Sequence, residues 1–412
     1  MASQRPTLGL ADAFDHIRAR SFPDVAPDLT GVELEWLVVP DAAGRYSSGA
    51  RLDDVALPGG SALSIEPGGQ LELSSRPATS LGELCFNVGD DVDALGGGVV
   101  AGGGLLLGMG LLADGPARRC LSTPRYEAMA AYFGADGPAG EIMMTSTASV
   151  QVNVGLGTGT ERDARWRRAN VLGPVLAAAF ANSPFAAGRP TGRASTRLGV
   201  WAAIDPTRTT SAWRSGAGCD SWAAYVLDAR VMLIRRDETD FVPILEHLTF
   251  RRWLAEGHEL GYPTMDDLDY HLGTLFPTVR PKGWLELRFL DALPTPWWQV
   301  AVAVTACVVR HPDAGARAER AAGRFAHCWS LASVCGLGHP GLQGAAQECF
   351  AAASDVLGDM GAGVDVVDAV AEYAARFVAR GRTPADDRLD AFMRTGSPLL
   401  DEDHHDLVGS AR

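Results

Sequence analysis

Four short segments of this chain alternate apolar residues with carboxylate or amide side chains, and this period-two pattern constrains the fold most. The first, Gly31–Val39, has the sequence GVELEWLVV. Successive side chains of a β-strand point to opposite faces of the sheet, so Glu33 and Glu35 should lie side by side, with the apolar residues on the other face. The segment predicts a strand with one acidic and one apolar face.

The second segment, Ile65–Ser74, begins with a turn. Its sequence IEPGGQLELS places Glu66 just before Pro-Gly-Gly, a tripeptide typical of turns. Beyond the turn, alternation puts Glu72 on the same side as Gln70 and Ser74 and opposite two leucines. We therefore expect a second acidic strand face, preceded by a turn that carries its own carboxylate.

The third and fourth segments add amides and a positive charge. Thr147–Gly155 has a polar row that includes Gln151 and Asn153, backed mostly by valines, and the segment WLELRF aligns Glu286 with Arg288. Any one such strand could simply keep a wet face, as antiparallel sheets often do. Four such faces without a lysine favour a shared function, because clustered carboxylates repel one another unless a cation lies between them.

The ligand chemistry of these rows predicts which cation would bind. They contain neither cysteine nor histidine, so zinc, iron and copper are poor candidates, whereas all-oxygen sites suit Mg²⁺ or Mn²⁺. Magnesium usually works with phosphates, whose charge it neutralises during phosphoryl transfer. The glycine clusters lack the lysine followed by Ser or Thr that completes a P-loop. We therefore predict ATP-dependent chemistry at a site without a P-loop.

The rest of the chain predicts an α+β fold. Strand-like runs and turns fill the first 160 residues, and alanine-rich helical periodicity dominates after Arg162. Because strands do not alternate regularly with helices, a mainly antiparallel sheet flanked by helices is favoured over a doubly wound fold. The expected helices are Arg167–Ala181, Phe241–Glu256, Asp267–Leu275, Trp297–His311, Ala316–Val334, Leu342–Leu357 and Val366–Ala379.

Composition excludes several classes of protein. The net charge of -14 repels nucleic acid and anionic membranes over most of the surface. The start has no signal-peptide pattern. The uncharged run Ala94–Ala113 is long enough to span a membrane but holds eight glycines. This composition is typical of a helix end followed by a buried strand, Leu105–Leu112, and not of a membrane span. Seven scattered cysteines without a C-x-x-C pair indicate reduced, mostly buried thiols. These features predict a cytoplasmic protein without nucleic-acid or membrane partners.

At the four polar strands the sequence resembles the plant-type glutamate-cysteine ligases, in particular the actinobacterial members that serve ergothioneine biosynthesis. The E-P-G-G-Q-x-E-L run is the most specific match. The matches follow the family's order from Gly31 to about Pro296: Gly31–Glu35, Glu66–Ser74, Arg125-Tyr126, Val150–Asn153, Ala181–Phe185 with Gly188, His271–Pro277 with Val279-Arg280, and Trp284–Arg288.

The resemblance implies a funnel-shaped antiparallel sheet related to the catalytic domains of glutamine synthetase and the guanidino kinases. It also implies an ATP-dependent ligase that joins L-glutamate to L-cysteine through γ-glutamyl phosphate. Carried over residue by residue, it implies five magnesium ligands: Glu33, Glu35, Glu66, Glu72 and Glu286. A distant bacterial branch has a histidine where this chain has Gln151, which leaves a direct ligand role for that amide open.

The resemblance also assigns roles to cationic and polar side chains. Arg288 and Arg197 are the candidate catalytic residues, and the planar fork of Arg288 would pair with a substrate carboxylate or the transferring phosphate. The remaining candidates are Arg125, Tyr126, Gln151 and Asn153 for substrate binding, and Arg280 and Lys282 for ATP binding. The structural alternative for Arg288 is an internal salt bridge. The alternative for Arg280 and Lys282 is that they are surface charges.

The resemblance fades beyond Trp297, and this suggests a division of the chain. We expect a catalytic core over residues 1–296, a helical part over 297–400 packed on that core, and a flexible tail over 401–412. Two alternatives to a glutamate-cysteine ligase stay open. A sister enzyme of the superfamily would use the same magnesium face with another amine or a guanidino acceptor, and a non-catalytic acidic metal-binding protein would not bind ATP.

Overall fold

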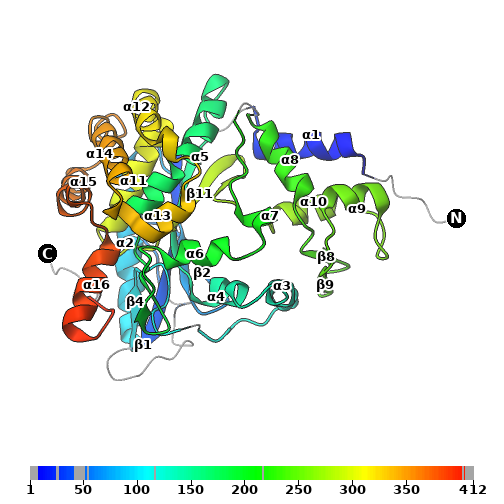
Figure 1. Cartoon of the computed structure of the whole chain (residues 1–412), viewed down its shortest axis with the longest axis horizontal. Helices are drawn as coiled ribbons and strands as arrows, with labels where there is room; N and C mark the ends of the chain where they lie inside the picture. Colours follow the sequence, from blue (N-terminus) through cyan, green and yellow to red (C-terminus); the bar gives the residue numbers. More distant parts are fainter. Residues whose placement is uncertain are drawn as a thin grey trace.

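The centre of the protein is an antiparallel β-sheet with helices on both sides (Figure 1). The computed structural model describes residues 8–24, 27–40, 52, 55–115, 117–215, 218–400 and 403. The strand order is β10-β11-β5-β1-β3-β2, and β4 pairs with the second half of β1. The bounds are β1 Thr30–Pro40, β2 Ala62–Ile65, β3 Leu71–Ser74, β4 Gly104–Leu107, β5 Ser149–Gly155, β10 Val279–Pro281 and β11 Trp284–Asp291. The predicted α+β class and antiparallel sheet are confirmed.

Helices form most of the remainder of the described chain. Four short strands make two small hairpins outside the main sheet: β6 Phe185–Ala186, β7 Arg189–Pro190, β8 Leu233–Arg235 and β9 Phe241–Pro243. The helices are α1 Leu10–Ser21, α2 Leu81–Ala101, α3 Pro124–Gly134, α4 Ala139–Ser146, α5 Thr160–Ala179, α6 Thr196–Ala202, α7 Pro206–Thr209, α8 Asp220–Asp228, α9 Phe250–Glu256, α10 Met265–Leu272, α11 Trp297–Arg310, α12 Pro312–Ala322, α13 Trp329–Cys335, α14 Pro340–Ser354, α15 Val364–Arg376 and α16 Pro384–Thr395.

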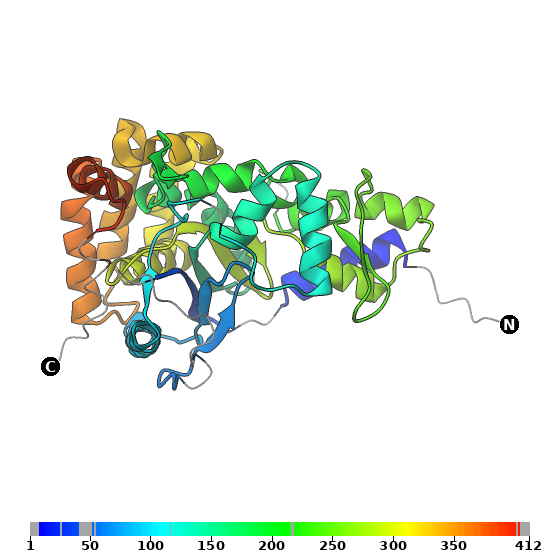
Figure 2. The ribbon, with the colours of Figure 1, turned by 90° about the horizontal axis from the view of Figure 1, so that it is seen from below.

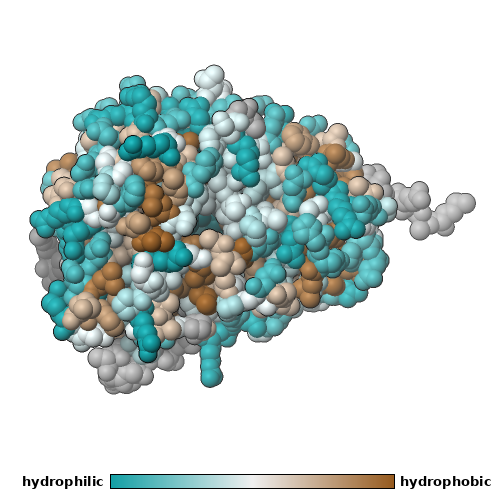
Figure 3. Space-filling model, in the orientation of Figure 1, coloured by the Kyte–Doolittle hydropathy of each residue, from teal (hydrophilic) through white to brown (hydrophobic). Residues whose placement is uncertain are grey.

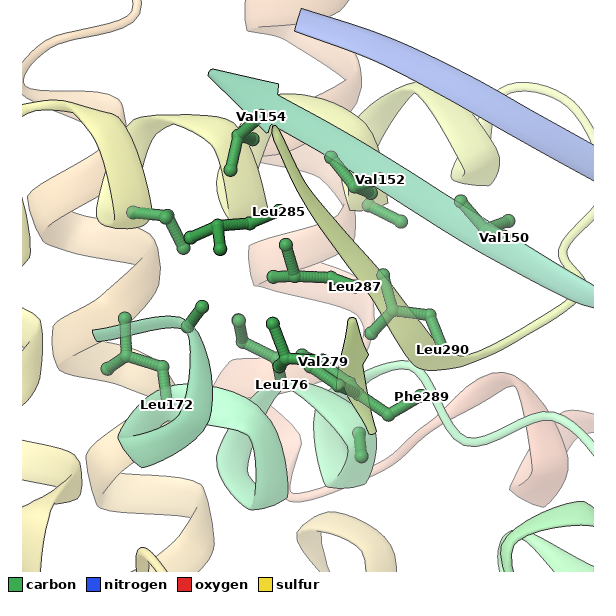
Figure 4. Packing of buried hydrophobic residues seen from close by; sticks show 14 of the residues in the cluster. Val150, Val152, Val154, Leu172, Leu176, Val279, Leu285, Leu287, Phe289 and Leu290 are labelled. Carbon is green, nitrogen blue, oxygen red and sulfur yellow. The ribbon is translucent and has the colours of Figure 1, made fainter. Parts of the chain in front are cut away.

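The apolar face of the sheet carries the core. Figure 4 shows valines of β5 and leucines of β11 turned toward Leu172 and Leu176 of α5. The apolar row of β1 is also buried, and α11 packs against β5. Each fully buried aliphatic side chain contributes roughly 1.5–3 kcal/mol to folding, so this face of the sheet is fixed and the polar residues must occupy the other.

The two ends of the molecule are built from different parts of the chain. Figures 1 and 2 show α1 with α8 to α10 at one end and α14 to α16 at the other. One apolar cluster nevertheless runs from Ala13 to Val378, so the C-terminal helices share the core of the sheet. The proposed division at residue 296 stays a prediction, and the tail 401–412 lies outside the described residues except for Asp403.

Two of the predicted helices are wrong in part. The segment Phe241–Glu256 begins as strand β9, which pairs with β8, and only its second half forms α9, capped by the Thr249 side chain. The segment Ala316–Val334 is interrupted between α12 and α13 by a short 3₁₀ turn, Gly323–Phe325. Apolar residues continue through both interruptions at spacings that a helix also allows, so the sequence pattern does not show them. The other five predicted helices overlap α5, α10, α11, α14 and α15.

The glycine-rich run Ala94–Ala113 is the end of α2 followed by β4, as predicted, although the strand is shorter than Leu105–Leu112. Among the helices of the described chain, none combines the length and the apolar character needed to cross a bilayer. The face in Figure 3 is largely hydrophilic, with hydrophobic residues gathered near α13.

All seven cysteines lie in the described part of the chain and none is in a disulfide. Cys85, Cys307 and Cys349 are buried, three others are half-buried, and Cys120 is exposed. Burial raises the pKa of each of the three buried thiols to about 12. The predicted reduced state agrees with the structure, but fewer than half of the thiols are fully buried.

Candidate active site

The polar rows of the four segments lie on one face of the sheet. Strand register pairs Glu35 with Glu72 across β1 and β3, and Glu33 with Gln151 across β1 and β5. In the next pair of strands, Glu286 of β11 lies opposite Asn153 of β5. Directly opposed residues of an antiparallel pair point to the same face. The sheet therefore brings together side chains that are up to 253 positions apart in sequence, from Glu33 to Glu286.

This face forms one wall of a pocket of about 410 Å³. Helices α3, α4 and α6 supply residues to the other walls. All but two of the predicted site residues line the pocket: Glu33, Glu35, Glu66, Glu72, Arg125, Tyr126, Gln151, Arg197, Arg280, Lys282 and Arg288. The exceptions are Glu286, which is fully buried, and Asn153, which lines an adjoining pocket.

The turn of the E-P-G-G motif places Glu66 at the pocket. Gly69 has φ of +87°, a conformation that favours glycine, and its N–H donates to the Glu66 carbonyl. At Gly68 an added Cβ would lie 2.0 Å from the carbonyl oxygen of Thr145. The side chain of Gln70 fixes the turn by accepting from Gly68 N–H and donating to the Thr147 carbonyl. The conformation and packing of the turn thus explain why the motif has glycine at positions 68 and 69 and glutamine at position 70.

Three of the carboxyl groups in the pocket are hard to ionise together. Burial, and then repulsion from a neighbouring glutamate, raises the pKa of Glu35, Glu66 and Glu72 to about 7 in each case. Glu35 accepts hydrogen bonds from Ser149 and Gln151, and Glu72 accepts from Ser64 and Ser74. These neutral donors do not offset the repulsion. A bound cation would.

The donor set fits a hard divalent cation such as Mg²⁺. Carboxylate oxygens of Glu33, Glu35, Glu66 and Glu72 face one pocket, with serine and amide oxygens beside them and no histidine or cysteine among the lining residues. Among the described residues, no group of three or more His, Cys, Asp or Glu side chains is close enough together to hold a metal ion by itself. Magnesium usually retains waters and binds phosphates in addition to one or two carboxylates, so an open set of this kind suits it.

We expect Mg²⁺ to stabilise the protein more at about pH 8 than at about pH 6. The folded-state pKa values near 7 lie above the ordinary value of 4.5. The stability that the protonated carboxyls provide is therefore complete below about pH 4.5 and is lost as the pH rises through about 7. A cation replaces the protons. Thermal unfolding at both pH values, with and without Mg²⁺, measures the increment, and an equal increment at both would contradict the assignment.

Glu286 occupies the cationic side of the site. Arg280, its register partner on β10, donates to both carboxylate oxygens at 2.6 and 3.0 Å, Lys282 donates at 3.1 Å, and Arg288 donates at 2.9 Å. Burial alone would raise the pKa of Glu286, but these three cations hold it well below its usual range. In this arrangement Glu286 anchors cationic side chains, and a metal would have to displace one of them. Its role as a ligand stays a prediction.

Two arginines that line the pocket, Arg197 and Arg288, have buried nitrogens without a hydrogen-bond acceptor in the described part of the chain. Arg288 donates through Nη1 to Gln151 and Glu286, and Arg197 donates through Nη2 to the Arg288 carbonyl. The buried Nε of Arg288 and the buried Nε and Nη1 of Arg197 have no hydrogen-bond acceptor among the described residues. Buried donors without partners are uncommon in native structures. The two guanidinium groups lie in the same pocket as the carboxylates, which indicates a site for an anion. The internal salt bridge predicted as the alternative for Arg288 is also present, with Glu286.

Helix α3 positions Arg125 and Tyr126 at the pocket. Thr123 caps its first turn, accepting from the Tyr126 N–H, and Pro124 occupies the first helical position. The Arg125 guanidinium lies over the ring of Tyr270 at 5.9 Å, and its buried Nε is a further donor without a partner in the described chain. The pair is therefore available to a ligand.

The sequence analysis missed the apolar wall of the pocket. Met129, Met143 and Met144 from α3 and α4, with Trp201 and Phe276, line it. These residues sit in helices or loops that carry no polar alternation, so nothing in their pattern separates them from ordinary core. The M-M pair in EIMMTS is the only local signal, and core packing explains such pairs as well.

A second, apolar pocket of about 310 Å³ adjoins the acidic face. It is lined by Glu33, which also lines the acidic pocket, and by Asn153 and Trp284 among other residues. Asn153 donates to Glu33 and accepts from the Trp284 ring N–H at 3.0 Å. Lys282 lies over the same ring at 5.1 Å. A flat apolar group could therefore enter next to the charged face.

Comparisons with known proteins place the chain among ligases. The family model described as glutamate-cysteine ligase family 2 matches residues 29–407. The glutamate–cysteine ligase EgtA of Mycolicibacterium smegmatis is 35% identical over 398 residues, covering 92% of this chain and 91% of that protein. EgtA of Mycobacterium tuberculosis is 36% identical, covering 82% and 79%. A glutamate–cysteine ligase structure from Francisella tularensis in complex with AMP has a TM-score of 0.44 at 13% identity, covering 94% and 89%.

Proposed function

This chain belongs to glutamate-cysteine ligase family 2, and from that premise we propose that its acidic pocket uses ATP and Mg²⁺ to join L-glutamate to L-cysteine. The product is γ-glutamylcysteine. The observation that carries the proposal is the pocket itself, in which four carboxylates face arginines with unused buried donors. Two relatives named glutamate–cysteine ligase, 35% and 36% identical over most of the chain, support the same activity.

The reaction needs activation because a carboxylate resists attack by an amine, its leaving group being an oxide. The γ-carboxylate of glutamate attacks the terminal phosphorus of ATP, which forms γ-glutamyl phosphate and releases ADP. The cysteine amine then attacks the acyl carbon, phosphate leaves with the bonding electrons, and the amine proton is released. The products are an amide, ADP and phosphate.

The acidic face would hold the magnesium, with Glu33, Glu35, Glu66 and Glu72 as ligands. Magnesium supplies charge neutralisation for the transferring phosphoryl group. The protein's own contribution is to orient the anions: Arg288 and Arg197, which both line the pocket, would bind the phosphoryl group or a glutamate carboxylate. Their backbone and side-chain bonds hold both guanidinium groups in place before substrate arrives.

The apolar features of the site suggest where the other groups bind. Methionine sulfur and aromatic rings are favourable neighbours for a thiol, so we place the cysteine side chain against the wall formed by Met129, Met143 and Met144. The adjoining pocket beside Trp284 is suited to the adenine, with Lys282 near the phosphates.

Phosphate release from ATP and Mg²⁺ with glutamate present tests the proposal. The assay compares cysteine, 2-aminobutyrate, other amino acids and no acceptor, with the product identified by mass. We expect cysteine-dependent release and a γ-glutamylcysteine product. Release with a different amine would move the function to a sister ligase, and no ATP turnover with any acceptor would favour a non-catalytic metal-binding protein.

We place this activity in the cytoplasm, where ATP and Mg²⁺ are supplied, as the first step of ergothioneine biosynthesis. The similarity to the two EgtA proteins supports the pathway. Loss of ergothioneine from cells that lack the gene, restored by added γ-glutamylcysteine, is the expected result. Unchanged ergothioneine would assign the enzyme to another thiol pathway.

A further inference from the structure

One buried carboxylate outside the acidic pocket, that of Asp291, is connected to an arginine of the pocket. Asp291 ends strand β11 and is 1% exposed. It accepts hydrogen bonds from the Asn182 N–H at 2.8 Å, from Ser183 Oγ at 2.7 Å and from Ser195 Oγ at 3.0 Å. Burial raises the pKa of Asp291, and the Arg197 guanidinium and these three donors act in the opposite direction by stabilising the ionised form. The residue is not among those that line the pocket.

Asp291 is joined to Arg197 by two routes. The Arg197 Nη1 lies 3.9 Å from Asp291 Oδ1, and the Arg197 backbone N–H donates to Ser183 Oγ, which itself donates to Asp291. Ser195, the third residue bound to Asp291, caps α6 by accepting from Leu198 N–H. The Asp291 carboxylate therefore holds both the Arg197 guanidinium and the first turn of α6, the helix that carries Arg197.

Asn182 ties this carboxylate to the C-terminal helix. Its side-chain nitrogen donates to the carbonyls of Gly108 and Ala292, and its side-chain oxygen accepts from Arg388 Nε of α16 at 2.7 Å. Arg388 is fully buried and forms an ion pair with Asp403 at 2.8 Å. A buried hydrogen-bonded network of this kind rigidifies its surroundings.

We propose that Asp291 is a positioning residue for the ligase reaction, holding Arg197 at the pocket wall, and that Asn182 and Arg388 of the C-terminal helix hold Asp291 in turn. The proposal rests on the proposed ligase function. The need for such a residue follows from the site: Arg197 is attracted both by Glu35, which lines the pocket with it, and by Asp291, which does not line the pocket. Without Asp291, attraction would draw the guanidinium into the acidic face, where it would compete with the metal cation.

A merely structural role for Asp291 makes a different prediction. Buried carboxylates that bind several donors are costly to remove wherever they occur, so loss of stability alone does not discriminate. A positioning role requires that the effect on catalysis pass through Arg197. The effects of changing Asp291 and Arg197 should then not add, whereas independent sites add in free energy.

A double-mutant cycle of Asp291→Asn and Arg197→Met measures this coupling. We expect Asp291→Asn to lower kcat/KM for glutamate about 30-fold in the wild-type background and less than about 3-fold in the Arg197→Met background. Asp205→Asn is the matched control, because Asp205 is a buried carboxylate paired at 2.9 Å with Arg208, which does not line the pocket. Its effect should be the same in both backgrounds.

Ser183→Ala keeps the inference testable where Asp291→Asn does not fold. It removes one hydroxyl that bridges Asp291 and the Arg197 N–H, and it should reproduce the same non-additivity at smaller size. Additive effects of Asp291→Asn or Ser183→Ala with Arg197→Met would overturn the proposal. If the wild-type protein shows no ligase turnover, the proposed function is wrong, but the positioning role of Asp291 can still be tested. The affinity for ATP with Mg²⁺, measured by calorimetry on the same single and double variants, then replaces kcat/KM in the double-mutant cycle.

Discussion

Glu35→Gln should lower cysteine-dependent phosphate release about 1,000-fold at saturating Mg²⁺, because several kcal/mol of charge stabilisation depend on correctly held metal. The same change should raise the thermal stability of the metal-free protein at about pH 8. Burial and repulsion from Glu66 raise the pKa of Glu35 to about 7, so above that pH the folded protein carries an unfavourable charge that glutamine lacks. Glutamine keeps the size of the side chain and can still accept a hydrogen bond from Ser149.

Activity and metal-free stability should therefore change in opposite directions for this variant. The gain in stability should shrink toward about pH 5, where Glu35 is already protonated. Glu348→Gln is the control: this carboxylate is exposed on α14 and pairs with Arg317 at 3.0 Å. It should alter neither rate nor its pH dependence. Normal turnover by Glu35→Gln, or equal losses of activity and stability, would refute its assignment to the metal site.

Arg288→Lys should reduce kcat about 100-fold although the positive charge is kept. Arg288 bonds Gln151 and Glu286 through one guanidinium nitrogen and leaves its Nε free. A lysine ammonium is a single point on a flexible stem, so it can satisfy Glu286 or reach a substrate anion but cannot do both in a fixed geometry. The loss should appear in kcat more than in the KM for ATP.

Steady-state kinetics of Arg288→Lys beside Arg317→Lys check this expectation. Arg317 forms its pairs with Glu348 and Asp355 on the surface, where an exchange for lysine should have no measurable effect. Near-normal rates for Arg288→Lys would make Arg288 a structural partner of Glu286. If Gln151→Ala lowers kcat as much as Arg288→Lys does, part of the loss comes from the Gln151 amide, which orients the Arg288 side chain.

The acidic face was predictable because its information is local. Alternation in β1 alone requires Glu33 and Glu35 to share a side, whatever the rest of the chain does. The family resemblance then selected Arg125, Tyr126 and Arg197, which the structure brings to the same pocket as those glutamates. Their chemical roles remain predictions, since no ligand contact tests them.

The pairing of charges was not predictable, because it depends on register. Arg280 meets Glu286 only because β10 and β11 align those two positions, and the sequence alone left Arg280 as a candidate for ATP or the surface. Asp291 was missed for a related reason. Its partners Asn182, Ser183 and Ser195 come from a loop about 100 positions earlier, and no spacing rule links them to the end of a strand.

The arrangement of the thiols matters for a protein whose substrate and product are themselves thiols. Exchange with cystine or other disulfides proceeds through thiolate, and thiols with a pKa of about 12 at Cys85, Cys307 and Cys349 hold almost none at neutral pH. Mixed disulfides with the reactants should therefore form first at exposed Cys120, whose Sγ lies 3.9 Å from the carbonyl of Glu66. Oxidative damage to this protein would begin beside the turn that carries Glu66, and its core would be spared.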